Sequence, residues 1–258
     1  MVRCAVTRVA RRAALGLVLI GTVAVGLQLA TVPPAPSPRP SISLSAELTS
    51  LFDPHAIARP LLAVVGASFS AGVGASSPRR AWPEDLANIL GWRLALAADP
   101  GAGYVNPGSG DRGPFSKLLA RLHLAGRDPA IVIVQGGHDD IGWPTALVKS
   151  RVESLLRTIM AEAPDARIGI LSVFGRAHRV TRRALATNRA IIDAARFVDP
   201  SVMIFDPLRA HWRFPRHRGH LHPTTAGDRW IAERLARELW RDGALGAQGY
   251  GGPLALSA

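Results

Sequence analysis

Cysteine and lysine are almost absent from this chain of 258 residues. Cys4 is its one cysteine, so the chain cannot close an intramolecular disulfide or build a cysteine metal cluster. Because Cys4 precedes the first apolar run, it is not placed like a lipoprotein cysteine. It is either a chance residue of a leader or an S-acylation site beside a membrane anchor. Only Lys117 and Lys149 are lysines, and we interpret this preference for arginine as an effect of genomic base composition rather than of function.

Acidic residues are also few relative to basic ones, and the formal net charge is +12 at pH 7. Such a charge can favour nucleic acid or an anionic surface. Several arginines lie in the N-terminal leader, others recur at helical spacing as on a solvated face, and no recognisable nucleic-acid module is present. We therefore predict no nucleic-acid partner. A dinucleotide fingerprint is missing too, since Gly66, Gly72 and Gly74 do not form G-x-G-x-x-G.

The N-terminal segment has the pattern of an export signal. Residues 3–12 carry four arginines, and residues 13–31 form an uncharged apolar run. That run approaches the ~20 residues that span a bilayer, and no clear A-x-A cleavage site follows it, so both a cleaved signal peptide and a retained anchor are open. The positive flank would stay cytoplasmic. We expect a domain that is secreted, or anchored in the cell membrane through this segment, outside the cytoplasm.

Composition divides the chain into four parts. We predict a signal peptide or membrane anchor over 1–31, a proline-rich linker over 32–45, a folded domain over 46–245 and a flexible tail over 246–258. The prolines of the linker disfavour helix and strand and favour an extended spacer. One domain of this size can bury a sizeable core.

Short apolar runs alternate with segments of helical periodicity in the folded domain. The predicted strands are 61–65, 130–134, 166–173 and 201–205, and the predicted helices are 81–91, 115–124, 144–163, 180–197 and 225–241. Continuous apolar runs are typical of buried parallel strands. The βαβ order therefore predicts an α/β fold, a three-layer α/β/α sandwich with a central parallel sheet, whose site gathers at the carboxyl ends of the strands.

Two polar clusters follow predicted strands. Ser68 comes after the first strand, at a predicted strand-to-helix turn where helix amides and the helix dipole would face a developing oxyanion. A serine that only caps the helix is the alternative. The second strand is followed by Gln135–Asp140, which suits either a site or a turn with capping aspartates.

A histidine cluster precedes the last predicted helix. His222 is a candidate general base, because an imidazole exchanges protons near neutral pH. His217, His220 and His222 could instead ligate a metal, but their spacing is loose and no helix organises them. We predict no metal and no organic cofactor.

Taken together, these segments resemble the SGNH (GDSL-type) hydrolase family. Gly66–Gly72 resembles the first family block, Gly-Asp-Ser-x-x-x-Gly, and Gly101–Tyr104 resembles the glycine block of the second loop. Gly137–Asp140 resembles the third block, Gly-x-Asn-Asp, and Leu221–Thr224 resembles the final block, Asp-x-x-His-Pro. The blocks occur in family order over about residues 60–241. The resemblance implies an SGNH/flavodoxin-like fold in an exported, actinobacterial-like member.

The resemblance also implies roles for individual residues. Ser68 would be the nucleophile, and His222 would deprotonate it and later protonate the leaving alcohol. The oxyanion would be held by the Ser68 amide, by the amide of Gly101 or Gly103, and by the side chain at Asp139. The implied substrate is an acyl ester of a small molecule, a lipid or a glycan.

This chain departs from the family pattern at three positions. Ala67 replaces the aspartate of Gly-Asp-Ser, and Asp139 replaces the oxyanion asparagine. A carboxylate repels an oxyanion, so Asp139 would help only when protonated, which burial and the neighbouring Asp140 would favour by raising its pKa. Gly219 stands where the triad aspartate is expected.

Substitutes for the missing acid lie elsewhere in the chain. Asp206 ends a predicted strand, Asp228 follows His222 in the closing helix, and His220 is close in sequence. Two hypotheses follow. One is a serine esterase; the other is a catalytically reduced relative that binds an acylated or glycan envelope ligand. An envelope O-acyltransferase is a related enzyme interpretation.

Overall fold

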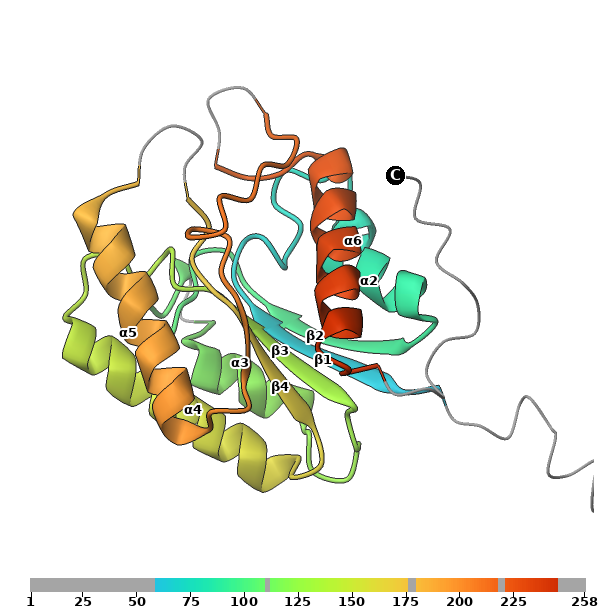
Figure 1. Ribbon diagram of the computed structural model, residues 1–258, viewed down its shortest axis with the longest axis horizontal. Coiled ribbons are helices and arrows are strands. Elements are labelled where there is room, and N and C mark those ends of the chain that lie inside the picture. Colours follow the sequence, from blue (N-terminus) through green and yellow to red (C-terminus); the bar gives the residue numbers. More distant parts are fainter. Residues whose placement is uncertain (1–58, 110–111, 176–179, 218–220, 246–258) are drawn as a thin grey trace, which may run out of the picture. The chain divides into compact units, whose positions relative to one another are not determined.

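The computed structural model describes residues 59–109, 112–175, 180–217 and 221–245 (Figure 1). The predicted leader, linker and tail lie outside these residues, as do the start of the predicted domain, Gly219 and His220. In the part of the chain that is described, no helix is both long enough and apolar enough to cross a membrane.

Five parallel strands form one sheet in the order β2-β1-β3-β4-β5. They are β1 (Leu61–Gly66), β2 (Arg93–Ala98), β3 (Ile131–Gln135), β4 (Arg167–Leu171) and β5 (Met203–Phe205). The four predicted strands are confirmed to within about two residues, but β2 was not predicted. Its sequence, RLALAA, is rich in alanine, which is depleted in strands, and its edge position leaves Arg93 and Leu96 exposed.

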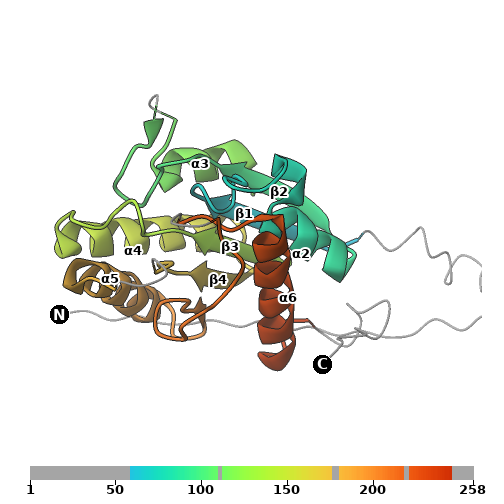
Figure 2. The ribbon, with the colours of Figure 1, turned by 90° about the horizontal axis from the view of Figure 1, so that it is seen from above.

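Helices cover both faces of this sheet (Figures 1 and 2). α3 (Phe115–Leu122), α4 (Thr145–Glu162) and α5 (Arg182–Val198) lie on one face, and α2 (Trp82–Leu90) and α6 (Thr225–Arg241) lie on the other. A short 3-10 helix, η1 (Pro78–Arg80), precedes α2. The five predicted α-helices and the three-layer α/β/α sandwich are confirmed.

Alternating side chains of the central strands feed two separate cores. In β1, Leu61, Ala63 and Val65 pack with α3, α4 and α5, whereas Leu62 and Val64 pack with α2 and α6. All five side chains are buried, as a strand covered on both faces requires. The continuous apolar run of β1 follows directly from this two-sided burial.

The strand order reverses between β1 and β3, and this position sets the location of the site. The chain adds β2 on one side of β1 and then crosses to add β3 on the other side. In the register, Gly66 pairs with both Ala98 and Gln135, so the loops after β1, β2 and β3 leave the sheet side by side. Such a reversal opens a crevice at the carboxyl ends of the strands, where ligands of this fold class bind.

Candidate active site

The loop after β1 carries Ser68 in a series of turns. Ala71 N donates to Ala67 O at 2.9 Å, and Val73 N donates to Ser68 O at 3.0 Å, but residues 68–74 form turns rather than a regular helix. The first regular α-helix after Ser68, α2, starts at Trp82. The predicted strand-to-helix turn is therefore wrong, and so is the predicted role for a helix dipole behind Ser68.

The side chain of Gln135 holds this turn against the end of β3. Its Oε1 accepts hydrogen bonds from Ala67 N at 3.3 Å, from Ser70 N at 3.2 Å and from Ser70 Oγ at 2.8 Å. Ser70 is fully buried, and Gln135 is buried at the end of an apolar strand. Sequence reasoning gave Gln135 no individual role. A buried amide that ends an otherwise apolar strand is the signal that could have found it, because such a group needs partners.

Ser68 and His222 meet at the carboxyl edge of the sheet. The distance between His222 Nε2 and Ser68 Oγ is 2.8 Å, although the two residues are 154 positions apart. This is within the range of a general base that takes a proton from a hydroxyl group. The Phe69 ring lies 5.3 Å from the imidazole, between ring centroids, and limits its position on one side. The structure thus brings together the two residues predicted as nucleophile and base.

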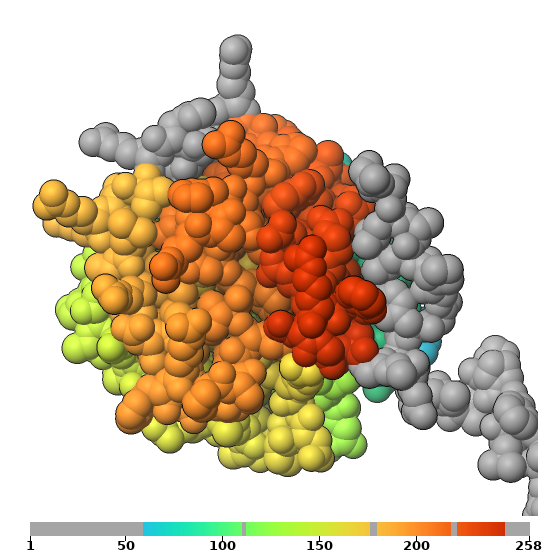
Figure 3. Space-filling view, in the orientation of Figure 1, coloured from blue at the N-terminus to red at the C-terminus, as the bar shows by residue number. Residues whose placement is uncertain are grey.

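Arg216 fastens the segment that carries His222. Its Nη1 donates to Gly175 O at 2.7 Å and to Leu221 O at 3.3 Å, so it links the loop after β4 to the residue before His222. The guanidinium lies 3.9 Å from the Phe214 ring centroid, and burial lowers the pKa of Arg216. The space-filling view shows the segment between α5 and α6 covering the surface between these helices (Figure 3). Arg216 therefore positions the loop of the candidate base.

Asp140 organises the loop after β2. This fully buried carboxylate accepts hydrogen bonds from Tyr104 N at 2.9 Å, Val105 N at 2.8 Å and Asn106 N at 3.1 Å. A Cβ atom added at Gly103 would lie 2.5 Å from both carboxylate oxygens, so only glycine fits at this position. The aspartate of the third block thereby shapes the glycine block of the second loop.

The two glycines proposed for the oxyanion differ in their hydrogen bonding. Gly103 N donates to Asn106 O at 2.9 Å, so this amide is already used within the loop. Gly101 has a φ angle of 82°, in the left-handed region that glycine adopts without strain. Within the described segments, no hydrogen bond of the Gly101 or Ser68 amide to another group of the chain is recorded. Of the two glycine amides, that of Gly101 is thus the one with no recorded bond within the loop.

Asp139 occupies the half-buried position after β3 where the family has asparagine. Burial, followed by the charge of Asp140, raises the pKa of Asp139 from 3.8 to about 6, while its own backbone amide opposes that rise. The direction and both causes agree with the expectation from sequence. Asn106 Nδ2 donates to the Asp139 carbonyl at 3.0 Å and ties this residue to the loop after β2. Asp139 therefore changes charge within the pH range of most enzyme assays.

Asp206 lies at the carboxyl edge of the sheet, as Ser68 does, but far from Ser68 along that edge. β5 is three strands from β1 in the sheet order, which corresponds to about 14 Å at the usual strand spacing. Its carboxylate accepts from Asn188 Nδ2 at 3.1 Å to each oxygen and from Arg209 N at 3.1 Å. These contacts give Asp206 a structural role, which is to attach α5 to the end of β5.

Asp228 lies in the layer formed by α2 and α6. Its Oδ1 accepts from Trp82 N, the first residue of α2, at 3.1 Å, and the whole residue is buried. Burial, and then the nearby Asp85, raises the pKa of Asp228 to about 7. The pKa of Asp85 is raised as well, by its own burial, with Arg229 and Arg80 opposing and Glu233 adding to the rise. The recorded contacts of Asp228 thus give it a helix-capping role.

We expect Asp228→Asn to stabilise the fold at pH 8. A pKa raised from 3.8 to about 7 means that wild-type stability is full below about pH 4 and falls as pH rises to about 7. The amide oxygen keeps the bond to Trp82 N, so the variant should gain about 4 kcal/mol at pH 8 and less than about 1 kcal/mol at pH 4. Urea unfolding at both pH values measures this difference. An equal effect of the substitution at both values would contradict the assignment.

The described part of the chain contains no group of three or more histidine, cysteine, aspartate or glutamate side chains that could hold a metal. His220 lies outside it, so the alternative of a metal site at His217, His220 and His222 stays untested. His217 Nε2 lies 2.9 Å from Gly74 O, next to the turns that follow Ser68.

The strand order is flavodoxin-like, and Ser68 and His222 meet at the carboxyl edge of the sheet, where ligands of this fold class bind. Residues 64–230 match the model of the GDSL-like lipase/acylhydrolase family, and the chain belongs to this family. No curated protein sequence matches it.

Solved structures of similar fold include esterases and an acyltransferase. A family two carbohydrate esterase from Clostridium thermocellum, solved with cellohexaose, is 19% identical with a TM-score of 0.54, over 72% of this chain and 65% of that one. The psychrotrophic esterase EstA from Pseudoalteromonas sp. is 16% identical with a TM-score of 0.56, over 70% of this chain and 97% of that one. A salicylyl-acyltransferase from a tetracycline biosynthetic pathway is 18% identical with a TM-score of 0.54, over 73% of this chain and 57% of that one. At these identities the likeness shows the fold.

Proposed function

We propose that this protein is a serine ester hydrolase in which Ser68 is the nucleophile and His222 is the general base. The observation that carries the proposal is the 2.8 Å contact between Ser68 Oγ and His222 Nε2, at the edge of the sheet where the strand order reverses. A serine that only capped a helix would not need this partner, and residues 68–74 form turns instead of a helix. Membership of a lipase/acylhydrolase family supports the same chemistry.

The proposed reaction has two steps. Ser68 Oγ attacks the ester carbonyl carbon while His222 Nε2 takes the hydroxyl proton, and the protonated imidazole then gives that proton to the leaving alcohol. Water, deprotonated by His222, then attacks the acyl carbon, the bond to Ser68 Oγ breaks, and the imidazolium returns its proton to Ser68 Oγ as the acid is released. The Ser68 and Gly101 amides and the protonated Asp139 carboxyl group donate hydrogen bonds to the oxyanion in both steps.

This proposal does not assign the orientation of the base to Asp206 or Asp228. The family's acid position is Gly219, and the contacts of Asp206 and Asp228 give those carboxylates other tasks. Arg216, bound to Leu221 O, and the Phe69 ring restrict the position of the imidazole.

The substrate we propose is an acyl ester of a small molecule, a lipid or a glycan. The carbohydrate esterase of similar fold supports the glycan option. An extracytoplasmic location, with residues 1–31 as signal peptide or membrane anchor, is part of the proposal and rests on the basic and apolar pattern of that segment.

One observation favours a second candidate function. Above pH 6 Asp139 is a carboxylate at the oxyanion position, which disfavours hydrolysis and suits a protein that only binds an acylated or glycan envelope ligand. An envelope O-acyltransferase is the related enzyme option, and the salicylyl-acyltransferase of similar fold supports it.

Hydrolysis of p-nitrophenyl acetate by the full chain at pH 6.5 tests the proposal. We expect saturable turnover that falls at least about 1000-fold in Ser68→Ala, because the nucleophile carries most of the covalent mechanism. The exposed Ser201→Ala is the matched control and should keep wild-type rates. Equal rates in wild type and Ser68→Ala would refute the serine mechanism. No turnover by either protein from pH 5 to 9 would favour the binding function.

A further inference from the structure

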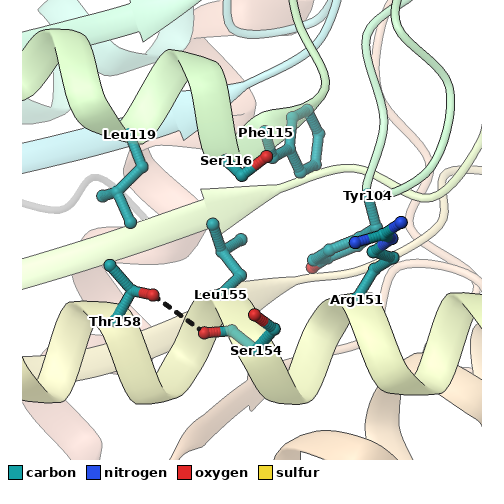
Figure 4. Close-up of a pocket in the computed structure, with 8 residues that line it drawn as sticks. All are labelled: Tyr104, Phe115, Ser116, Leu119, Arg151, Ser154, Leu155 and Thr158. Carbon is teal, nitrogen blue, oxygen red and sulfur yellow. Dashed lines mark hydrogen bonds between the residues drawn. The ribbon is translucent and has the colours of Figure 1, made fainter.

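A pocket of about 60 Å³ lies between α3 and α4, and its walls share no residue with the Ser68–His222 pair. Figure 4 shows Tyr104 reaching into it from the loop after β2, Phe115 and Leu119 on α3, and Arg151, Ser154 and Leu155 on α4. One water needs roughly 10–15 Å³ of such space. The pocket is thus large enough for a group of a few heavy atoms and too small for a sugar ring.

The floor of the pocket contains a buried donor without an acceptor. Tyr104 is 2% exposed, and its hydroxyl group has no hydrogen-bond partner in the described part of the chain. Its ring packs edge-on against Phe115, with 5.0 Å between centroids, which fixes the direction of the hydroxyl group. Burial, and then Asp140, raises the pKa of Tyr104, so the phenol stays a protonated donor. Leaving such a group unpaired destabilises the fold, and a ligand that accepts a hydrogen bond from it removes this penalty.

The mouth of the pocket is positively charged. Arg151 is exposed, and among the described residues no ion pair is recorded for it, whereas Arg157 on the same helix lies 3.9 Å from Glu153. Ser154 is exposed beside Arg151, and Figure 4 places both on the α4 wall. An anion would meet a phenol donor on the inside and a guanidinium on the outside. Leu119 and Leu155 supply apolar walls that a bare inorganic anion would not use.

We infer that this pocket is a binding site for a small carboxylate that carries a short alkyl group, such as acetate or propionate. The carboxylate oxygens accept from Tyr104 and Arg151, and the alkyl group contacts Leu119 and Leu155. Acetate has four heavy atoms, which agrees with the size of the pocket.

Binding at this pocket would reach the loop proposed to hold the oxyanion. Tyr104 N donates to Asp140, and Phe115 N donates to Gly103 O at 2.8 Å. Tyr104 is itself part of the loop that contains Gly101 and Gly103, and Phe115 is bonded to that loop. A ligand that fixes the Tyr104 side chain also fixes the backbone next to Gly103.

The chain has two tyrosines, Tyr104 and Tyr250, which makes tyrosine Cζ labelling a local probe of this pocket. Full-length protein with ¹³Cζ-tyrosine is titrated with acetate and then with propionate, in the Ser68→Ala background, so that no result depends on hydrolysis. We expect a saturable shift of the resonance that Tyr104→Phe removes. Calorimetry should show that Tyr104→Phe weakens binding about 10- to 100-fold without lowering the melting temperature, since it deletes an unpaired hydroxyl group.

Arg151→Ala should weaken acetate binding several-fold and reduce its dependence on salt, while the matched control Arg157→Ala should bind like the parent. Chloride at the same ionic strength should leave the Tyr104 resonance unchanged. A resonance that does not respond to either carboxylate would overturn the inference, and so would acetate binding that is unchanged in both Tyr104→Phe and Arg151→Ala.

Discussion

Asp139→Asn should raise the rate of ester hydrolysis by an amount that grows with pH. With a pKa of about 6, roughly half of Asp139 is protonated at pH 6 and about 1% at pH 8. If only the protonated form donates to the oxyanion, an asparagine that always donates gives a rate ratio, variant over wild type, of about 2 at pH 6, about 10 at pH 7 and about 100 at pH 8. The value at pH 8 is within the range measured for loss of a single oxyanion donor, which is about 100- to 1000-fold.

The rate ratio of variant to wild type is the quantity to measure, because protonation of His222 affects both proteins and its effect cancels in the ratio. The kcat/KM values for p-nitrophenyl acetate are determined at pH 6, 7 and 8, with Asp165→Asn, an exposed aspartate, as the control. For the wild type alone, the rate should rise as pH falls from 8 towards 6 and should fall again once His222 is protonated. A ratio that is the same at all three pH values would show that Asp139 does not govern the oxyanion site.

His222→Ala should lower kcat by about 100- to 10,000-fold, the contribution typical of a positioned general base and acid. The distance of 2.8 Å from Ser68 Oγ makes His222 the group that receives the nucleophile's proton. A half-buried side chain of this size contributes little to the core, so the unfolding midpoint in urea should change only slightly.

The control for this substitution is His123→Asn. His123 is exposed at the end of α3 with a φ angle of 46°, a conformation that asparagine tolerates. Rates like those of wild type are expected for it. If His222→Ala retained more than about a tenth of the wild-type kcat, another group would have to be the base.

Strands and helices were predictable from the sequence where burial in the fold requires a recognisable pattern of apolar residues. β1 and β3 are apolar throughout because both faces of each strand are covered, and such runs are visible without a structure. β2 was missed because an edge strand of alternating leucine and alanine has neither the burial nor the β propensity that makes a strand recognisable. The helix expected behind Ser68 was wrong because the chain forms turns held by Gln135 from a different strand.

The residues of the candidate site were predictable, but their supports were not. Ser68, Asp139 and His222 stand in short motifs, so their chemistry can be inferred from order and spacing. The tasks of Asp140 and Arg216 depend on backbone groups of other loops, which no motif records. Asp206 was a reasonable candidate acid from its place at a strand end, but strand order decides its distance from Ser68, and that order emerges only in three dimensions.

Covalent labelling tests the central claim, that Ser68 is an activated nucleophile, most directly. The full chain is incubated at pH 6 with an alkyl fluorophosphonate, and the modified peptide is located by mass spectrometry. The account predicts a single adduct on Ser68 that forms much more slowly in His222→Ala, because the base must remove the hydroxyl proton. An adduct on another serine, or labelling of Ser68 at equal rates with and without His222, would contradict it.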